Sequence, residues 1–168
     1  MTWMAACIVD DARESAVRVL CLGNDLLADD AFGGVVAERI RREAPGSVDV
    51  TFTANTGLSL LEHILNTRHL VVVDTVLSGR AEPGTVLVMT ERDVQAPSGN
   101  SPHYVGLFEA LSLARKLRLP APEEVTIIAV EAADCTTVGG AMTPAVKGAV
   151  PGVLALVSEI IVESLTRV

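Results

Sequence analysis

The chain has 168 residues and a formal net charge of −8, with 49% apolar and only 3% aromatic residues. This composition supplies the core of one domain and argues against a disordered chain. The acidic balance argues against a nucleic-acid-binding protein, because phosphate contacts need a basic surface and base stacking needs aromatic side chains.

The sequence predicts a cytoplasmic protein. No uninterrupted apolar run approaches the roughly 18 residues of a membrane span. The apolar patch at residues 4–9 is not preceded by the basic region of a signal peptide. The cysteines Cys7, Cys21 and Cys135 are odd in number and lack C-x-x-C spacing, which is typical of reduced thiols.

Strand and helix patterns alternate along the chain. Residues 1–16 fit no periodic pattern and are expected to form a loose extension, whereas residues 17–168 are expected to form a single domain. Strands are expected at residues 17–22, 48–53, 69–74, 84–90 and 125–130. Helices are expected from Asp30 to about Pro45, at 58–65, at 103–117 and from Thr143 onward, with a long loop at 91–102 and a kink or split at Pro151-Gly152.

One connection is too short for a parallel crossover. Only nine residues separate Asp74 from Gly84, and a helical crossover takes about a dozen or more. The pattern therefore predicts an α/β three-layer sandwich, with helices on both faces of a five-stranded, mostly parallel twisted sheet that has one antiparallel strand. The helix from His103 must then run back along the sheet, so that its start lies at the carboxyl edge.

Three polar residues are expected to meet at this edge, where open α/β sheets place their ligands. Asp30 follows the first strand, Asp74 ends the third, and His103 opens a helix. Two carboxylates and an imidazole suit a borderline divalent metal such as nickel or zinc, or equally an acid–base pair. We therefore select Asp30, Asp74 and His103 as candidate catalytic and metal-contacting residues.

Simpler interpretations remain open for some of these residues. Asp29 or Asp30 at a helix start is a good N-cap, and His103 could be an ordinary loop or capping residue. Asp74 is harder to explain in this way, because a carboxylate after four buried apolar residues is costly unless it is paired or hydrated.

Other residues give weaker signals. His63 and His69 are expected to be surface or structural residues, Cys21 a core thiol, and Cys135 a thiol without an activating neighbour. The chain has no G-x-S-x-G motif for a serine hydrolase. It also lacks G-x-G-x-x-G, and the carboxylates after the first strand would repel a pyrophosphate.

Four segments together resemble the nickel–iron hydrogenase maturation proteases, which remove the carboxy-terminal extension of the hydrogenase large subunit. The segment Leu22–Gly33 (LGNDLLADDAFG) resembles the opening motif of that family. The segment His69–Asp74, followed by Pro83–Val86, resembles the second motif of the family. Ser101–Leu107 (SPHYVGL) resembles the third motif, and Met142–Val146 (MTPAV) resembles the carboxy-terminal motif. The resemblance covers residues 17–165 in the same order and with similar spacing.

The resemblance implies a function and a site. It implies an endopeptidase that acts on a nickel-loaded large-subunit precursor, with metal contacts at Asp30, Asp74 and His103. It also implies that the nickel arrives with the substrate and that no organic cofactor is used. These are the residues that the edge argument selects independently.

The resemblance departs from the family pattern at residues 51–57 (TFTANTG), where family members usually carry an acidic residue and a Gly-Gly-Thr-like turn. Two alternatives therefore stay open. One is a non-catalytic binding module that reads the metal on the large subunit, and the other is a small-molecule hydrolase on the same scaffold.

Overall fold

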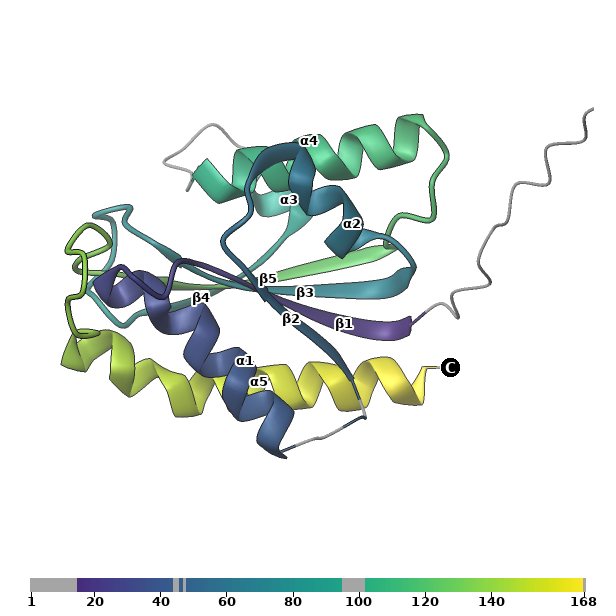
Figure 1. Ribbon diagram of the computed structural model, residues 1–168. Helices are drawn as coiled ribbons and strands as arrows, with labels where there is room; N and C mark the ends of the chain where they lie inside the picture. The colour runs from purple at the N-terminus through teal and green to yellow at the C-terminus, as the bar shows by residue number, and fades with distance from the viewer. Residues whose placement is uncertain (1–14, 44–45, 47, 95–101, 168) are drawn as a thin grey trace, which may run out of the picture.

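The computed structural model describes residues 15–43, 46, 48–94 and 102–167. Its centre is a five-stranded sheet of order β2-β1-β3-β5-β4 (Figure 1). The strands are β1 (Ser15–Leu22), β2 (Asp49–Thr53), β3 (Thr67–Val76), β4 (Val86–Thr90) and β5 (Glu124–Glu131). All neighbours pair in parallel except β4, which is antiparallel to β5. The predicted mixed sheet is therefore confirmed.

Helices cover both faces of this sheet, which confirms the three predicted layers (Figure 1). One face packs against two long helices, α1 (Phe32–Glu43) and α5 (Pro144–Thr166). The other packs against α4 (Pro102–Lys116) and a short pair, η2 (Gly57–Leu60) and α2 (Leu61–Ile64). Two small elements, η1 (Ala28–Ala31) and α3 (Glu91–Val94), lie in connections.

The central strand β3 explains the run of four apolar residues that the sequence shows. Val71 and Val73 belong to the core beneath α1 and α5, whereas Leu70 and Val72 belong to the core beneath α4. All four are fully buried. A strand covered on both faces needs no polar alternation, so the run is continuous.

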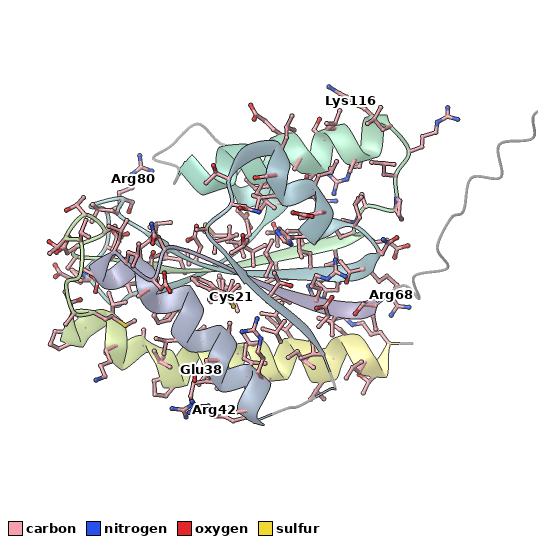
Figure 2. The ribbon with its side chains drawn as sticks, in the orientation of Figure 1. Cys21, Glu38, Arg42, Arg68, Arg80 and Lys116 are labelled. Carbon is pink, nitrogen blue, oxygen red and sulfur yellow. The ribbon has the colours of Figure 1, made fainter. Side chains whose placement is uncertain are left out.

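The short connection after β3 leads to β4 at the far edge of the sheet, beside β5. Because β4 runs antiparallel, α4 runs back toward the start of β5, and its amino end lies at the carboxyl edge of the parallel strands (Figure 1). In Figure 2, Arg80 marks this carboxyl edge and Arg68 marks the opposite edge of the sheet.

Part of the predicted loop 91–102 is helical, so the loop is shorter than predicted. Helix α3 begins directly after β4, and Asp93 accepts hydrogen bonds from the backbone N–H and the hydroxyl of Thr90, both at 2.7 Å. The bond from the Thr90 N–H is one half of a capping box, in which an acid three residues later accepts the N–H of the threonine before the helix. Residues 95–101 of the predicted loop lie outside the described residues.

The last helix is not split at Pro151, so of the predicted kink or split the split does not occur. Helix α5 continues through Pro151 and Gly152, and both residues are exposed. The carbonyl of Lys147, which loses its helical N–H partner to the proline, lies in an exposed turn where water can satisfy it.

Helix α5 is long and apolar enough to cross a membrane by length and composition alone, with a window of mean hydropathy 1.8. Lys147 and Glu159 interrupt this stretch, so it is not an uninterrupted apolar run. Its stripe Val146, Val153 and Val157 is fully buried against the sheet, so we interpret α5 as a core helix.

The boundaries at the amino end differ slightly from the expectation. Strand β1 begins at Ser15, inside the expected extension 1–16, and Ser15 Oγ donates to the carbonyl of Val17. Residues 1–14 lie outside the described part of the chain, as do residues 44 and 45, where α1 was expected to end.

Candidate functional site

Three loops gather at the carboxyl edge of the sheet, one after each of β1, β3 and β5 (Figure 1). The first and third loops are paired by a bridge between Leu27 and Val138. The second is joined to the end of β5 by a hydrogen bond from the Ala132 N–H to the carbonyl of Val76, at 2.8 Å. The candidate residues of the sequence lie in and beside these loops.

Asp30 is buried in η1, directly after the loop that follows β1. Its Oδ1 accepts a hydrogen bond from the hydroxyl of Thr75 at 3.0 Å. The backbone of Asp30 is packed closely against Gly23, where an added Cβ would lie 2.2 Å from the carbonyl oxygen of Asp30. The carboxylate therefore faces β3, and the structure gives no side-chain cap to η1.

Asp74 is fully buried on the neighbouring strand. It pairs with Ala129 of β5, and β3 continues for two residues beyond it, so Asp74 lies within the strand rather than at its end. Its Oδ1 accepts the backbone N–H of Thr75 at 2.8 Å. Thr75 thus contacts both carboxylates, one through its N–H and the other through its hydroxyl.

His103 occupies the second position of α4, whose amino end lies at the same edge (Figure 1). The structure does not describe its side chain. Among the side chains that it does describe, no three His, Cys, Asp or Glu residues form a group that could hold a metal ion. The roles of Asp30, Asp74 and His103 as metal contacts and catalytic groups stay predictions.

The neighbouring Asp29 joins distant segments and does not cap η1, although capping was one interpretation that the sequence left open. It is fully buried, and its carboxylate accepts four hydrogen bonds from the loop that follows β5. The donors are the N–H groups of Ala133, Asp134 and Thr143 and the hydroxyl of Thr143. Burial alone would raise the pKa of Asp29, but these hydrogen bonds outweigh it and hold the pKa below its usual range.

A second buried acid, Glu131, fixes the loop after β3. Its carboxylate accepts the N–H groups of Ser78 and Gly79, at 2.8 and 2.7 Å, and the hydroxyl of Ser78 at 2.6 Å. The sequence analysis missed Glu131. The signal was present, because Glu131 follows the buried strand at Val130 just as Asp74 follows four apolar residues.

The two described cysteines are free thiols, and neither is activated. Cys21 lies between the sheet and α1 (Figure 2), and burial raises its pKa to about 12. Cys135 lies beside the site, with its Sγ 4.0 Å from the hydroxyl of Thr75. Burial, together with the nearby charges of Asp30, Asp29 and Asp74, raises its pKa to about 11. Both thiols are therefore protonated near neutral pH.

His69 is a structural residue, as the sequence indicated, and lies at the opposite edge from the candidate site. Its Nδ1 is 2.7 Å from Ser164 Oγ, and its Nε2 is 2.9 Å from Thr126 Oγ1. Because Ser164 donates its own proton to the carbonyl of Ile160, it accepts a hydrogen bond from Nδ1–H of His69. Burial lowers the pKa of His69, against a smaller raising effect of Glu124.

His63 lies in α2, beside the loop where the family resemblance is poorest. Its Nε2 is 3.3 Å from the side-chain nitrogen of Asn55. This loop leads to Gly57, which α4 approaches so closely that a Cβ on Gly106 would lie 2.3 Å from the Gly57 nitrogen. The atypical loop is thus packed against the first turns of the helix that carries His103.

Comparisons with known proteins agree with this arrangement. The family model of the HycI hydrogenase maturation proteases matches residues 35–160. The hydrogenase 2 maturation protease of Escherichia coli is 31% identical over 118 residues, which are 68% of this chain and 71% of the relative. The hydrogenase expression/formation protein HupD of Rhizobium leguminosarum is 31% identical over 82% of this chain and 70% of its own.

Solved structures agree in fold. The hydrogenase maturating endopeptidase HybD from E. coli superposes with a TM-score of 0.77 and 29% identity, over 88% of this chain and 93% of that one. HybD from Thermococcus kodakarensis, at 22% identity and a TM-score of 0.70, shares the fold over 86% of this chain and 98% of its own. These similarities do not favour a non-catalytic module or a small-molecule hydrolase. The chain belongs to the hydrogenase maturation protease family, whose members are endopeptidases.

Proposed function

We propose that the chain removes the carboxy-terminal extension from a nickel-loaded [NiFe]-hydrogenase large-subunit precursor. Proteases of this family act on hydrogenase large-subunit precursors in general. The observation that carries the proposal is the pair of buried carboxylates, Asp30 and Asp74, which Thr75 links at the carboxyl edge. Buried carboxylates are costly, and they are common where a protein performs chemistry or binds a cation.

Nickel belongs to the substrate in this proposal. Asp30, Asp74 and His103 would contact it, which is a donor set that suits a borderline divalent ion. Three protein donors leave the remaining coordination positions to the precursor, so the site would distinguish a loaded precursor from an empty one. The ion would polarise the scissile carbonyl.

Water is the proposed nucleophile. In the chain alone, a pKa of about 11 keeps the Cys135 thiol protonated, which favours water over this thiol as the nucleophile. One of the two carboxylates would accept the proton of the attacking water, which adds to the peptide carbonyl. The carboxyl would then return this proton to the leaving nitrogen as the peptide bond breaks, and the released extension would depart with the new amino terminus.

Mass spectrometry of a cognate precursor tests the proposal, with nickel-loaded and metal-free samples treated alike. We expect a short carboxy-terminal peptide to be lost only from the loaded sample. Asp30→Asn should slow this cleavage about 100-fold or more, because it removes a charge that acts in the transition state. Asp25→Asn is the matched control, since Asp25 is an exposed acid in the same loop.

Two results would contradict the proposal. Equal cleavage of loaded and metal-free precursor would disprove the dependence on nickel. Equal rates for the wild type and Asp30→Asn would disprove the role of Asp30.

We also propose that the chain works in the cytoplasm. The described cysteines, Cys21 and Cys135, are both free, which suits a reducing compartment. Cell fractionation tests this assignment, and recovery of the chain in the membrane or periplasmic fraction would contradict it.

A further inference from the structure

Three large apolar side chains are exposed at the carboxyl edge, one on each of its three loops. Leu26 follows β1 and is 64% exposed, Leu77 follows β3 and is 58% exposed, and Val138 follows β5 and is 77% exposed. We call these three residues the apolar rim. Exposed apolar side chains are ordinary when scattered, but a group of them around one site indicates a contact surface.

The apolar rim lies close to the candidate site along the chain. Its first residue lies four positions before Asp30, its second three positions after Asp74, and its third three positions after Cys135. The side chains of these site residues converge on Thr75, whose hydroxyl is 3.0 Å from Asp30 Oδ1 and 4.0 Å from Cys135 Sγ. A protein substrate bound at the two carboxylates therefore lies beside the loops that carry the rim.

The loops that carry the rim are held in place by the rest of the fold. The N–H of Gly139 donates to the carbonyl of Leu26 at 2.8 Å, and that of Ala28 donates to the carbonyl of Thr137 at 3.1 Å. Glu131 fixes the remaining loop from beneath, through three hydrogen bonds. A surface that is ordered before binding loses little conformational entropy when a partner covers it.

We infer that the apolar rim is the docking surface for the large-subunit precursor, and that it contacts an apolar patch of the folded precursor beside the segment to be cut. The inference rests on the proposed function, which requires a protein substrate at this edge. It adds a recognition element that is independent of the metal. In this arrangement the carboxylates contact the nickel, whereas the rim contacts the protein that carries the nickel.

Two triple variants distinguish the effect of removing the rim from the effect of removing exposed apolar side chains elsewhere. The rim variant is Leu26→Gln, Leu77→Gln and Val138→Thr. The control is Leu117→Gln, Leu165→Gln and Val162→Thr, which changes the same residue types at exposed positions of α5 and directly after α4. Binding of the nickel-loaded precursor is measured by titration calorimetry, and its cleavage is measured in parallel.

We expect the rim variant to raise both Kd and KM about tenfold or more, as is typical when apolar contacts are removed from an interface, with kcat within about twofold of the wild type. The control should match the wild type. Equal binding by the two triple variants would overturn the inference. Binding without cleavage by the wild type would instead overturn the proposed function, while the Kd values would still decide the role of the rim.

Sedimentation of the protein alone tests the other possible occupant, a second copy of this chain. We expect the wild type and the rim variant to sediment alike. A wild-type dimer that the rim variant abolishes would assign the rim to self-association and would overturn the inference.

Discussion

Gly106 of α4 and Gly57, the first residue of η2, meet backbone to backbone. A Cβ on Gly106 would lie 2.3 Å from the nitrogen and 2.5 Å from the Cα of Gly57, which is closer than any side chain can approach. The contact seats α4 three residues after position 103. The placement of His103 therefore depends on a glycine one helical turn away.

Replacement of Gly106 by alanine tests this contact. Since backbone lies on both sides, the added methyl group must push α4 away, and we expect a loss of about 1–3 kcal/mol in the free energy of unfolding. Cleavage should fall as well, because position 103 moves. Gly148→Ala is the control, since nothing lies within 4 Å of a Cβ there, and alanine should stabilise that helix by about 0.5–1 kcal/mol. Urea denaturation measures both, and equal stabilities would contradict the contact.

Asp29 joins the loop after β1 to the start of α5. Its Oδ1 accepts the Thr143 N–H at 2.6 Å, and its Oδ2 accepts the Ala133 and Asp134 N–H groups at 2.9 Å. We expect Asp29→Ala to cost about 3 kcal/mol of unfolding free energy, because buried N–H groups lose a charged acceptor. Asp29→Asn should cost less, since one carbonyl oxygen remains. A cost for Asp29→Ala no larger than that of the exposed Asp25→Asn would contradict this role.

Acidification should lower the free energy of unfolding through the protonation of His69. Its pKa is lowered in the folded state, chiefly by burial, so the unfolded chain binds the proton first as the pH falls. The contribution of His69 to the free energy of unfolding is complete above its unfolded pKa of about 6.5, and it is lost as the pH falls through its lower pKa in the folded state. His69→Gln should flatten the dependence of unfolding free energy on pH between about 7 and 5. Thr126→Val should keep the dependence on pH, because the imidazole remains. A dependence as steep in His69→Gln as in the wild type would contradict the assignment to His69.

Cys135 should be unreactive and dispensable for cleavage. With a pKa of about 11, only about 0.1% of this thiol is ionised at pH 8, so alkylation by iodoacetamide should be about 100-fold slower than for an ordinary cysteine. Peptide mass spectrometry measures the rate, with urea-unfolded protein as the reference. Cys135→Ala should cleave precursor within about threefold of the wild type, which a thiolate nucleophile would not permit.

The layered fold could be predicted from the sequence because its causes are local. The four apolar residues 70–73 indicate a strand buried on both faces, and the nine-residue connection before Gly84 excludes a crossover. Asp30 and Asp74 both contact Thr75 near the carboxyl edge, as the order of the parallel strands indicates, although Asp74 lies two residues before the end of β3. The start of helix α3 is equally local, and the spacing of Thr90 and Asp93 could have indicated it.

The hydrogen bonds that hold the site together could not be predicted in this way. Asp29 reaches Ala133 across 104 residues and Thr143 across 114, and no local pattern records such a pair. A helix-start aspartate fits the capping interpretation equally well until its distant partners are known. Pro151 is similar, because its tolerance depends on which side of α5 faces solvent.

The long reach of Asp29 also orders events during synthesis. The ribosome makes Asp29 114 residues before Thr143, and a carboxylate without its buried partners stays in water. The loop after β1 therefore closes only when β5 and the residues up to 143 have emerged, as expected of a domain that folds as a unit. A nascent chain would carry both candidate carboxylates long before it could cut, so proteolytic competence arrives with the completed fold.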